Sequence, residues 1–302
     1  MMLHDIHIIG NPIAGGGAAG EIRKASALLV NEGCEVTVSM TTGKGDAEAF
    51  ARDIAEKATR SAVPMVIAAG GDGTINEVAN GLAGSPVPMA ILPFGTTSVL
   101  AREIGIRPGD AAAAVRYALT TPPRPVSLGR LTYSNGGTRF FLLMAGIGFD
   151  GEVVYRMNPA IKRWIGKGAY ALSACRAVFL FRPKPLSVTY ATPDGSVREM
   201  SGRSIIVSNA SRYGGDFVIT PGADITKPSL QLMVTGSANP LDFLRLLAAV
   251  ATGAKIPGAF YETVTSVRID GISHMQIDGD YAGTTPVVID VVPDSLQLVM
   301  KE

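Results

Sequence analysis

Short apolar runs alternate with amphipathic stretches along the first part of the chain. The apolar runs predict strands at residues 6–9, 35–40, 65–69 and 89–92. The amphipathic stretches predict helices at residues 21–31, 46–57 and 77–82, and a further helix through residues 100–103. Strands that alternate with helices are typical of a parallel sheet covered by helices, whose ligands bind at the carboxyl ends of the strands.

The pattern changes at residues 120–125, which read TTPPRP. Successive prolines block a helix, so we expect a linker there. Beyond it, short strand-like runs separated by turn signals predict a β-rich domain, interrupted by two helices at 167–181 and 240–252. We therefore expect an α/β domain at residues 1–125 and a β-rich domain at 126–302. The strands predicted in the second domain are 126–133, 139–144, 186–192, 204–208, 230–235, 264–270, 274–277 and 287–291.

Composition narrows the classes of function. The formal net charge of the 302 residues is +1, which gives no reason to expect a nucleic-acid partner. Cys34 and Cys175 are the only cysteines and the three histidines are scattered, so neither a disulfide framework nor a zinc cluster is expected. The amino-terminal residues lack the pattern of a secretory signal, and no apolar run is long enough to cross a bilayer. We expect a cytoplasmic protein, at most peripheral at the inner face of a membrane.

Three glycine-rich segments follow predicted strands: NPIAGGG at 11–17, AGGDGTIN at 69–76 and PFGTT at 93–97. Glycine lets the backbone approach a ligand closely, and amides at a helix start attract phosphate. Asp72 lies inside the second segment. A carboxylate among phosphate-binding amides requires a cation or a donated hydroxyl proton nearby. This favours a nucleotide phosphate site with Mg²⁺ or proton-transfer chemistry, although a tight turn with a capping aspartate explains the segment equally well by itself.

The other segments are less specific when taken singly. Residues 11–17 lack the Lys-Ser/Thr pair of a Walker A loop, and a flexible turn is an equal alternative. Thr96 and Thr97 are typical of helix caps. Near the carboxyl terminus, residues 276–281 read QIDGDY, in which Asp278 and Asp280 flank a glycine. By itself this segment favours a β-turn with solvated aspartates.

The combination is more informative than its parts. The order NPxAGGG, GGDGTINEVANGL, LPFGTTxxLAR and a late DGD resembles the diacylglycerol kinase catalytic family, which includes bacterial lipid kinases, sphingosine kinases and ceramide kinases. Further matches at 148–150, Asn209, 214–215, Pro221 and Ala223 extend the resemblance over most of the chain. It implies an ATP-binding α/β domain like that of NAD and diacylglycerol kinases, a β-sandwich second domain and an active cleft between them.

The resemblance also implies residue roles. The expected ATP contacts are Asn11, Ala14, Gly15, Thr41, Gly70, Gly71, Asp72, Gly73, Thr74, Asn76 and Thr96. The late motif implies that Asp280 is the general base, which takes the proton of an attacking alcohol. Asp72 is the candidate carboxylate linked to Mg²⁺ of Mg-ATP, and Asp278 assists either role.

Three departures from the family pattern bear on these roles. Asp280 stands where the family has the longer glutamate, which shortens the reach of the base by one methylene. Ser98-Val99 replace the Asn-Asp pair that often follows the third glycine motif. Residues 225–229 contain Lys227 where some bacterial members have a metal-binding aspartate. We expect the Lys227 ammonium to replace the charge of that second ion.

A kinase with a lipid substrate must reach the bilayer surface. Lys162, Arg163 and Lys167 surround Trp164, the single tryptophan, and this mixture suits an anionic headgroup layer. An ordinary amphipathic helix packed on the second domain is the alternative, and the sequence slightly favours it.

We therefore expect an ATP- and Mg²⁺-dependent lipid kinase that phosphorylates a lipid hydroxyl, with diacylglycerol as the default acceptor. Two alternatives stay open. A NAD kinase also carries GGDGT, and a nucleotide-binding regulatory protein without catalysis would explain the changes at Ser98-Val99 and Asp280. The sequence leaves a homodimer open, does not identify the acceptor lipid, and does not decide whether the base is Asp280 or Asp72.

Overall fold

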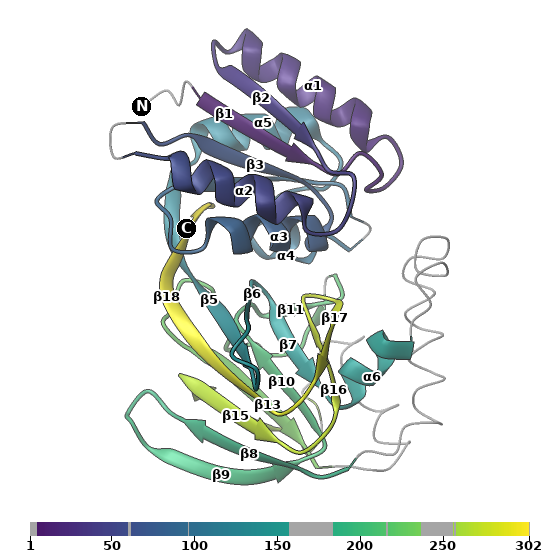
Figure 1. The fold of residues 1–302 in the computed structure, drawn as a ribbon, viewed down its shortest axis with the longest axis vertical. Coiled ribbons are helices and arrows are strands. Elements are labelled where there is room, and N and C mark those ends of the chain that lie inside the picture. Colours follow the sequence, from purple (N-terminus) through teal and green to yellow (C-terminus); the bar gives the residue numbers. More distant parts are fainter. Residues whose placement is uncertain are drawn as a thin grey trace. The chain divides into compact units, whose positions relative to one another are not determined.

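The computed structural model describes residues 5–59, 62–95, 97–156, 184–215, 217–236, 256 and 258–301 (Figure 1). The chain forms two compact units, Met1–Leu128 with Asp294–Glu302, and Gly129–Pro293. Two segments of the chain, β5 (Pro123–Tyr133) and β18 (Val287–Val299), pass from one unit into the other. The two helices predicted at 167–181 and 240–252 lie outside the described residues.

The first unit is the α/β domain that the sequence predicted. Its parallel strands follow the order β2-β1-β3-β4, and the end of β18 pairs in parallel with β4. All six residues of β3 are buried, as in a parallel sheet covered on both faces. The strands are β1 (Asp5–Gly10), β2 (Glu35–Met40), β3 (Met65–Gly70) and β4 (Pro88–Pro93).

Helices complete this unit on both sides of the sheet (Figure 1). Side chains of α1 and α5 share one apolar core with β1, β3 and β4, including Ile22, Leu29 and Val115. On α3, Gly81 permits close packing, since a Cβ there would lie 2.6 Å from the Ala51 side chain of α2. The helices are α1 (Ala18–Asn31), α2 (Asp46–Lys57), α3 (Asp72–Leu82), α4 (Val99–Glu103) and α5 (Ala111–Thr120). The sequence analysis missed α5.

Two local predictions in this unit were wrong. The loop expected at 70–76 is far shorter, because β3 ends at Gly70 and α3 begins at Asp72. Gly73, Thr74 and Asn76 are therefore residues of α3. The expected linker at 120–125 contains the start of β5, since its prolines stand at the beginning of the strand, where a missing N–H is tolerated.

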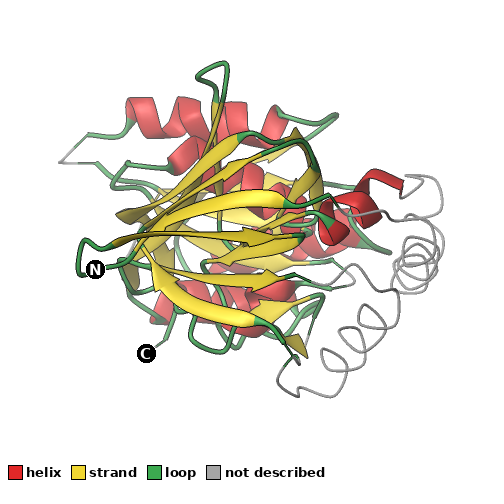
Figure 2. Cartoon of the chain, turned by 90° about the horizontal axis from the view of Figure 1, so that it is seen from below, coloured by secondary structure: helices red, strands yellow, loops and turns green. Residues whose placement is uncertain are grey.

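The second unit is a β-sandwich, in agreement with the predicted β-rich domain (Figure 2). One sheet runs β14-β13-β10-β7-β16-β17, and the other joins β18, β15, β8 and β9 with β5 and β6. One apolar core contains side chains of both sheets, such as Ile205 and Met275 from the first and Val188 and Ile289 from the second. The remaining strands are β6 (Thr138–Phe141), β7 (Met144–Ile147), β8 (Leu186–Ala191), β9 (Val197–Gly202), β10 (Ser204–Ser208), β11 (Arg212–Tyr213), β12 (Phe217–Val218), β13 (Leu230–Thr235), β14 (Phe260–Val264), β15 (Ser266–Asp270), β16 (His274–Ile277) and β17 (Asp280–Thr284).

Several details of this unit differ from the sequence analysis. The strand predicted at 139–144 is divided between β6 and β7, and the one at 264–270 between β14 and β15. A helix, α6 (Phe149–Arg156), follows β7 and was not predicted. The end of the chain, assigned to the second domain from sequence, belongs to the first unit because β18 continues along β4 there. In the part of the chain that is described, no helix combines the length and apolarity needed to cross a bilayer.

Candidate functional site

The three glycine-rich segments of the first unit meet at the carboxyl ends of its strands. The Asn11 amide donates to the Ala69 carbonyl over 2.9 Å, and the Phe94 amide donates to the Gly70 carbonyl over 2.8 Å. A Cβ on Gly95 would lie 3.0 Å from the Gly71 Cα, so the second and third turns are in close backbone contact. The sequence predicted that these turns share one edge of the sheet, and the structure brings them together.

The first segment is held by its own asparagine. Asn11 Oδ1 accepts a hydrogen bond from the Ile13 amide at 3.1 Å, and Asn11 Nδ2 donates to Thr74 Oγ1 at 3.5 Å. The Ala14 amide donates to the Asn11 carbonyl. Gly15 has a φ of +69°, and a Cβ there would lie 2.6 Å from the Phe94 carbonyl oxygen. This position therefore requires glycine, both for its backbone conformation and for contact with the third segment.

Helix α3 begins directly at this edge. Its first internal hydrogen bond runs from the Ile75 amide to the Gly71 carbonyl, and no side chain caps its amino terminus. The amides of the first helical turn have no acceptor within the helix, and together with the helix dipole they attract an anion. Gly73 lies in this turn and is exposed.

Asp72 connects the second segment with the third. Its Oδ2 accepts a hydrogen bond from Thr97 Oγ1 at 3.1 Å, and its Oδ1 accepts one from the Leu100 amide at 3.4 Å. The prediction that Thr97 caps α4 was wrong. Ser98 is the N-cap residue with a φ of 42°, and its hydroxyl donates to the Gly95 carbonyl. Thr96 lies outside the described residues.

The β2–α2 loop adds the remaining predicted contact of this unit. Thr41 is buried, and its amide donates to the Gly10 carbonyl over 2.8 Å. The following turn is fixed by Asp46, whose Oδ2 accepts from the Thr42 amide and hydroxyl. These hydrogen bonds, above all the one from the Thr42 amide, lower the pKa of Asp46. Glu77 on α3 accepts from the Gly45 amide at 3.0 Å, which ties the loop to the second segment.

Asn76 differs from the other predicted phosphate contacts. It lies in the second turn of α3 and is buried, with 6% of its surface exposed. Its side-chain oxygen accepts a hydrogen bond from Asn80 Nδ2 at 3.1 Å. This pairing links two consecutive turns of α3.

In the second unit, Asp278 and Asp280 flank the turn of the β16–β17 hairpin. Asp278 and Gly279 have φ of 48° and 86°, the left-handed pair typical of a tight two-residue hairpin turn. The Asp278 carboxylate accepts hydrogen bonds from three consecutive backbone amides at the start of β7, at 2.8 Å from Leu142, 2.9 Å from Leu143 and 3.0 Å from Met144. Asp278 therefore anchors the turn. Asp280 begins β17 opposite Ile277 and is partly exposed.

The carboxylates of the described residues include no group of three metal-ligating side chains. A magnesium ion in a kinase is held mainly by substrate phosphates with one or two carboxylates, so this arrangement fits an ion carried by the nucleotide. Asp72 is the first residue of α3 and is partly exposed, so its carboxylate is of a kind that suits such an ion.

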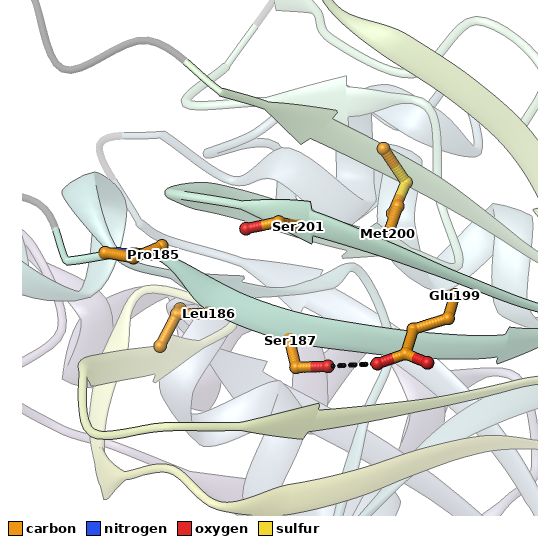
Figure 3. Close-up of a pocket in the computed structure, with 6 residues that line it drawn as sticks. All are labelled: Pro185, Leu186, Ser187, Glu199, Met200 and Ser201. Atoms are coloured by element: carbon orange, nitrogen blue, oxygen red, sulfur yellow. Dashed lines mark hydrogen bonds between the residues drawn. The ribbon is translucent and has the colours of Figure 1, made fainter.

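A surface hollow on the β8–β9 hairpin is separate from these residues (Figure 3). It is lined by Pro185, Leu186, Ser187, Glu199, Met200 and Ser201. Its polar side chains pair with each other, since Ser187 Oγ donates to Glu199 Oε1 at 2.9 Å. None of the residues predicted from sequence to form the site lines it.

Comparison with known proteins decides the family. Residues 5–131 match the diacylglycerol kinase catalytic domain, and residues 144–300 match the YegS C-terminal NAD kinase beta sandwich-like domain. The chain belongs to the diacylglycerol kinase catalytic-domain family. This confirms the resemblance stated from the sequence and identifies a member of a family of lipid kinases.

The chain is similar to two curated diacylglycerol kinases over most of their length. It is 30% identical to a diacylglycerol kinase of Bacillus subtilis (strain 168) over 84% of this chain and 82% of the relative. It is 29% identical to a diacylglycerol kinase of Mycobacterium tuberculosis over 96% of this chain and 93% of the relative.

Two solved structures from Bacillus anthracis strain Sterne share the fold of this family member. The match to the first covers 100% of this chain and 96% of the chain in that structure, with a TM-score of 0.79 and 24% sequence identity. The match to the second, a diacylglycerol kinase, covers 99% of this chain and 97% of the chain in that structure, with a TM-score of 0.71 and 23% sequence identity.

Sequence reasoning missed several residues that hold candidate site residues within their own unit. Glu77 follows the GGDGTIN segment, where the pattern predicts only a helix, and Gln276 lies where the pattern predicts only a strand. Asp150 was noted as a family match without a role. The sequence signal for Gln276 is a polar residue between two apolar ones, Met275 and Ile277, in a short strand. Polar residues at such positions are seldom buried without a specific partner.

Proposed function

We propose that this protein transfers the γ-phosphate of ATP to the hydroxyl group of a lipid alcohol, with diacylglycerol as the first acceptor to test. The observation that carries this proposal is the junction of three glycine turns through Asn11, Gly71 and Gly95 in a chain of the diacylglycerol kinase family. The named relatives are diacylglycerol kinases, which favours a lipid acceptor over NAD.

The first unit supplies the nucleotide site in this proposal. The uncapped first turn of α3 offers amides and dipole charge to the phosphates, and the first segment, held by Asn11, contributes the neighbouring backbone. Thr41 and Thr96 are the further proposed contacts. Asp72 would hold the Mg²⁺ ion that accompanies the phosphates. That ion would neutralise the charge that develops on the transferred group.

Asp280 is the proposed general base. An alcohol must lose its proton as its oxygen attacks the γ-phosphorus, and a partly exposed carboxylate can accept that proton. Asp278 is less suited, since both of its oxygens already accept backbone hydrogen bonds. We therefore assign the base to Asp280 and the anchoring of its turn to Asp278.

The test is transfer of labelled γ-phosphate from ATP, with Mg²⁺, to a panel of acceptors in mixed micelles. The panel contains diacylglycerol, monoacylglycerol, sphingosine, ceramide and a polyprenol, with NAD as a soluble acceptor. Asp280→Asn is compared with Asp53→Asn, which alters an exposed aspartate of α2 paired with Lys57. The proposal expects one labelled lipid, lost only in Asp280→Asn. Labelled NAD would support a NAD kinase, and ATP binding without any labelled acceptor would support a protein without catalysis.

A lipid substrate also requires contact with a membrane surface. The segment proposed for this contact, Lys162, Arg163, Trp164 and Lys167, lies outside the described residues. Its assignment depends on the cations beside the single tryptophan. A homodimer is a further proposal, tested by light scattering of the purified protein.

A further inference from the structure

The side chain of Gln276 bridges two parts of the β-sandwich unit. Its Oε1 accepts a hydrogen bond from the Gly279 amide at 2.7 Å, and its Nε2 donates to Asp150 Oδ2 at 2.5 Å. Both side chains lie in the interior, with 2% of Gln276 and 4% of Asp150 exposed. Buried polar groups are costly unless their hydrogen bonds are satisfied, so this bridge is a specific feature of the fold.

Glycines make the bridge possible. Gly146 on β7 is the ladder partner of Gln276, and any side chain at this position would collide with the Asp150 carboxylate. Gly151 likewise allows α6 to lie directly against the β16 backbone at His274. A third partner, the Tyr213 hydroxyl, donates to Asp150 Oδ1. The sequence thus leaves room for a buried carboxylate over β7 and supplies it with two donors.

The bridge ends at the turn that precedes Asp280. The Asp278 carboxylate is bound to three amides at the start of β7, and the Gly279 amide is bound to Gln276. Both residues of the turn are therefore fixed by contacts outside the hairpin ladder. The position of the Asp280 backbone follows from theirs, because Asp280 is the next residue in the chain.

We propose that Gln276 and Asp150 are positioning residues for Asp280 in phosphoryl transfer. This inference rests on the proposed function, in which Asp280 takes the proton of the acceptor hydroxyl. A glutamine suits this bridge because its neutral side chain can accept from an amide and donate to a carboxylate at the same time. A displacement of a catalytic group by about 1 Å can cost on the order of 100-fold in rate, so a loosened turn lowers kcat.

The bridge can be tested by reversing its polarity. In Gln276→Glu two carboxylates face each other, and in Asp150→Asn the donor of Gln276 loses its charged acceptor. The double variant keeps the bridge, since the new amide at position 150 can donate to the new carboxylate at position 276, which still accepts from the Gly279 amide. We expect each single variant to lower kcat by about 10- to 100-fold with the KM for ATP unchanged, and the double variant to recover most of the loss. Gln231→Glu, on β13 of the same sheet, is the matched control and should retain wild-type kcat.

A second measurement does not depend on catalysis. Hydrogen exchange of the peptide spanning residues 275–282 reports the protection of the Gly279 amide, which should fall in Gln276→Leu and in Gln276→Glu. Tyr213→Phe removes the hydroxyl that donates to Asp150 and serves as the milder variant if a substitution at Gln276 prevents folding. It should lower kcat by a few-fold, about the loss expected for one hydrogen bond.

The outcomes separate this inference from the proposed function. If the wild type phosphorylates no acceptor, the proposed function fails, while exchange still tests the bridge. If the wild type is active and the Gly279 amide loses protection without any change in kcat, the positioning role is overturned. Failure of the double variant to recover activity, with its exchange restored, would overturn it as well.

Discussion

Asp72 of α3 accepts a hydrogen bond from Thr97 Oγ1 at 3.1 Å, so the carboxylate of one glycine segment holds the turn of the next. A second bond from the Leu100 amide places the same carboxylate at the start of α4. Asp72 therefore has a structural role in addition to the proposed one at Mg²⁺. The two roles can be separated by experiment, because the structural role requires a hydrogen-bond acceptor and the proposed role at Mg²⁺ requires a negative charge.

Replacing Asp72 by asparagine should abolish activity with little loss of stability. The amide oxygen still accepts one hydrogen bond, so we expect the free energy of unfolding to fall by about 1 kcal/mol or less. Loss of the charge should reduce kcat by at least about 100-fold, since the ion that Asp72 is proposed to hold neutralises the charge developing on the transferred phosphate. Thr97→Val is the matched variant, which removes the hydrogen bond and keeps the charge. Substantial activity in Asp72→Asn would exclude a metal-linked role.

Two neighbouring glycines of the first segment should differ in their tolerance of alanine. Gly15 has a φ of +69° and a Cβ there would lie 2.6 Å from the Phe94 carbonyl oxygen, whereas a Cβ on Gly16 meets nothing within 4 Å. We expect Gly15→Ala to lower the free energy of unfolding by about 1–2 kcal/mol and to weaken ATP binding, and Gly16→Ala to change neither appreciably. Thermal unfolding and calorimetric titration with ATP measure both effects. Equal behaviour of the two variants would contradict the contact between the first and third segments.

Lys227 should support its turn through charge alone. Its Nζ lies 3.5 Å from Asp224 Oδ2, and Thr226 donates to Asp224 Oδ1 from both its amide and its hydroxyl. Both groups are partly exposed, so solvent screening limits the contribution of the pair, and Lys227→Met should cost below about 1 kcal/mol. Neither the wild type nor Lys227→Met should gain thermal stability from Mg²⁺ in the absence of nucleotide. A melting temperature that rises with Mg²⁺ in the wild type would indicate a metal ion at this turn.

The same turn predicts a pH dependence. Burial by itself raises the pKa of Asp224, but the hydrogen bonds from Thr226 and the charge of Lys227 outweigh it and lower the pKa below the ordinary 3.8. A lowered carboxyl pKa contributes stability that is present above the unfolded value and is lost as pH falls through the folded value. Urea unfolding at pH 7 and at pH 3 should therefore show a smaller penalty for Asp224→Asn at the lower pH. An equal penalty at both would assign the effect to packing.

Charge reversal of the proposed membrane segment should weaken binding to anionic vesicles. We expect Lys162→Glu, Arg163→Glu and Lys167→Glu together to lose on the order of 3 kcal/mol of binding free energy, about 1 kcal/mol for each cation. Sedimentation with vesicles that contain phosphatidylserine measures the change. Reversal of Lys24, Arg52 and Lys57, which lie on the helices of the first unit, is the control for net charge. Unchanged binding in the first variant would refute the assignment.

The sequence by itself determined the class of the fold and the location of the glycine-rich turns that we propose for phosphate binding. Strands such as 65–70 are continuous apolar runs, and the glycine motifs follow them directly, so local pattern and motif order were sufficient. The sequence also placed Asp278 and Asp280 at one turn, because a glycine between two aspartates at the end of a strand is a strong local signal.

Only the tertiary structure decided which carboxylates are anchored and by what. Asp278 is bound to amides at 142–144, and Gln276 is bound to Asp150. The path of β18 back to β4 likewise joins residues that are far apart in the chain. Such contacts follow from strand pairing and helix packing across more than a hundred residues, whereas hydrophobic period and turn chemistry report only neighbours in sequence. For this reason the sequence identified the groups that we propose for the chemistry, and the fold determined the groups that hold them in place.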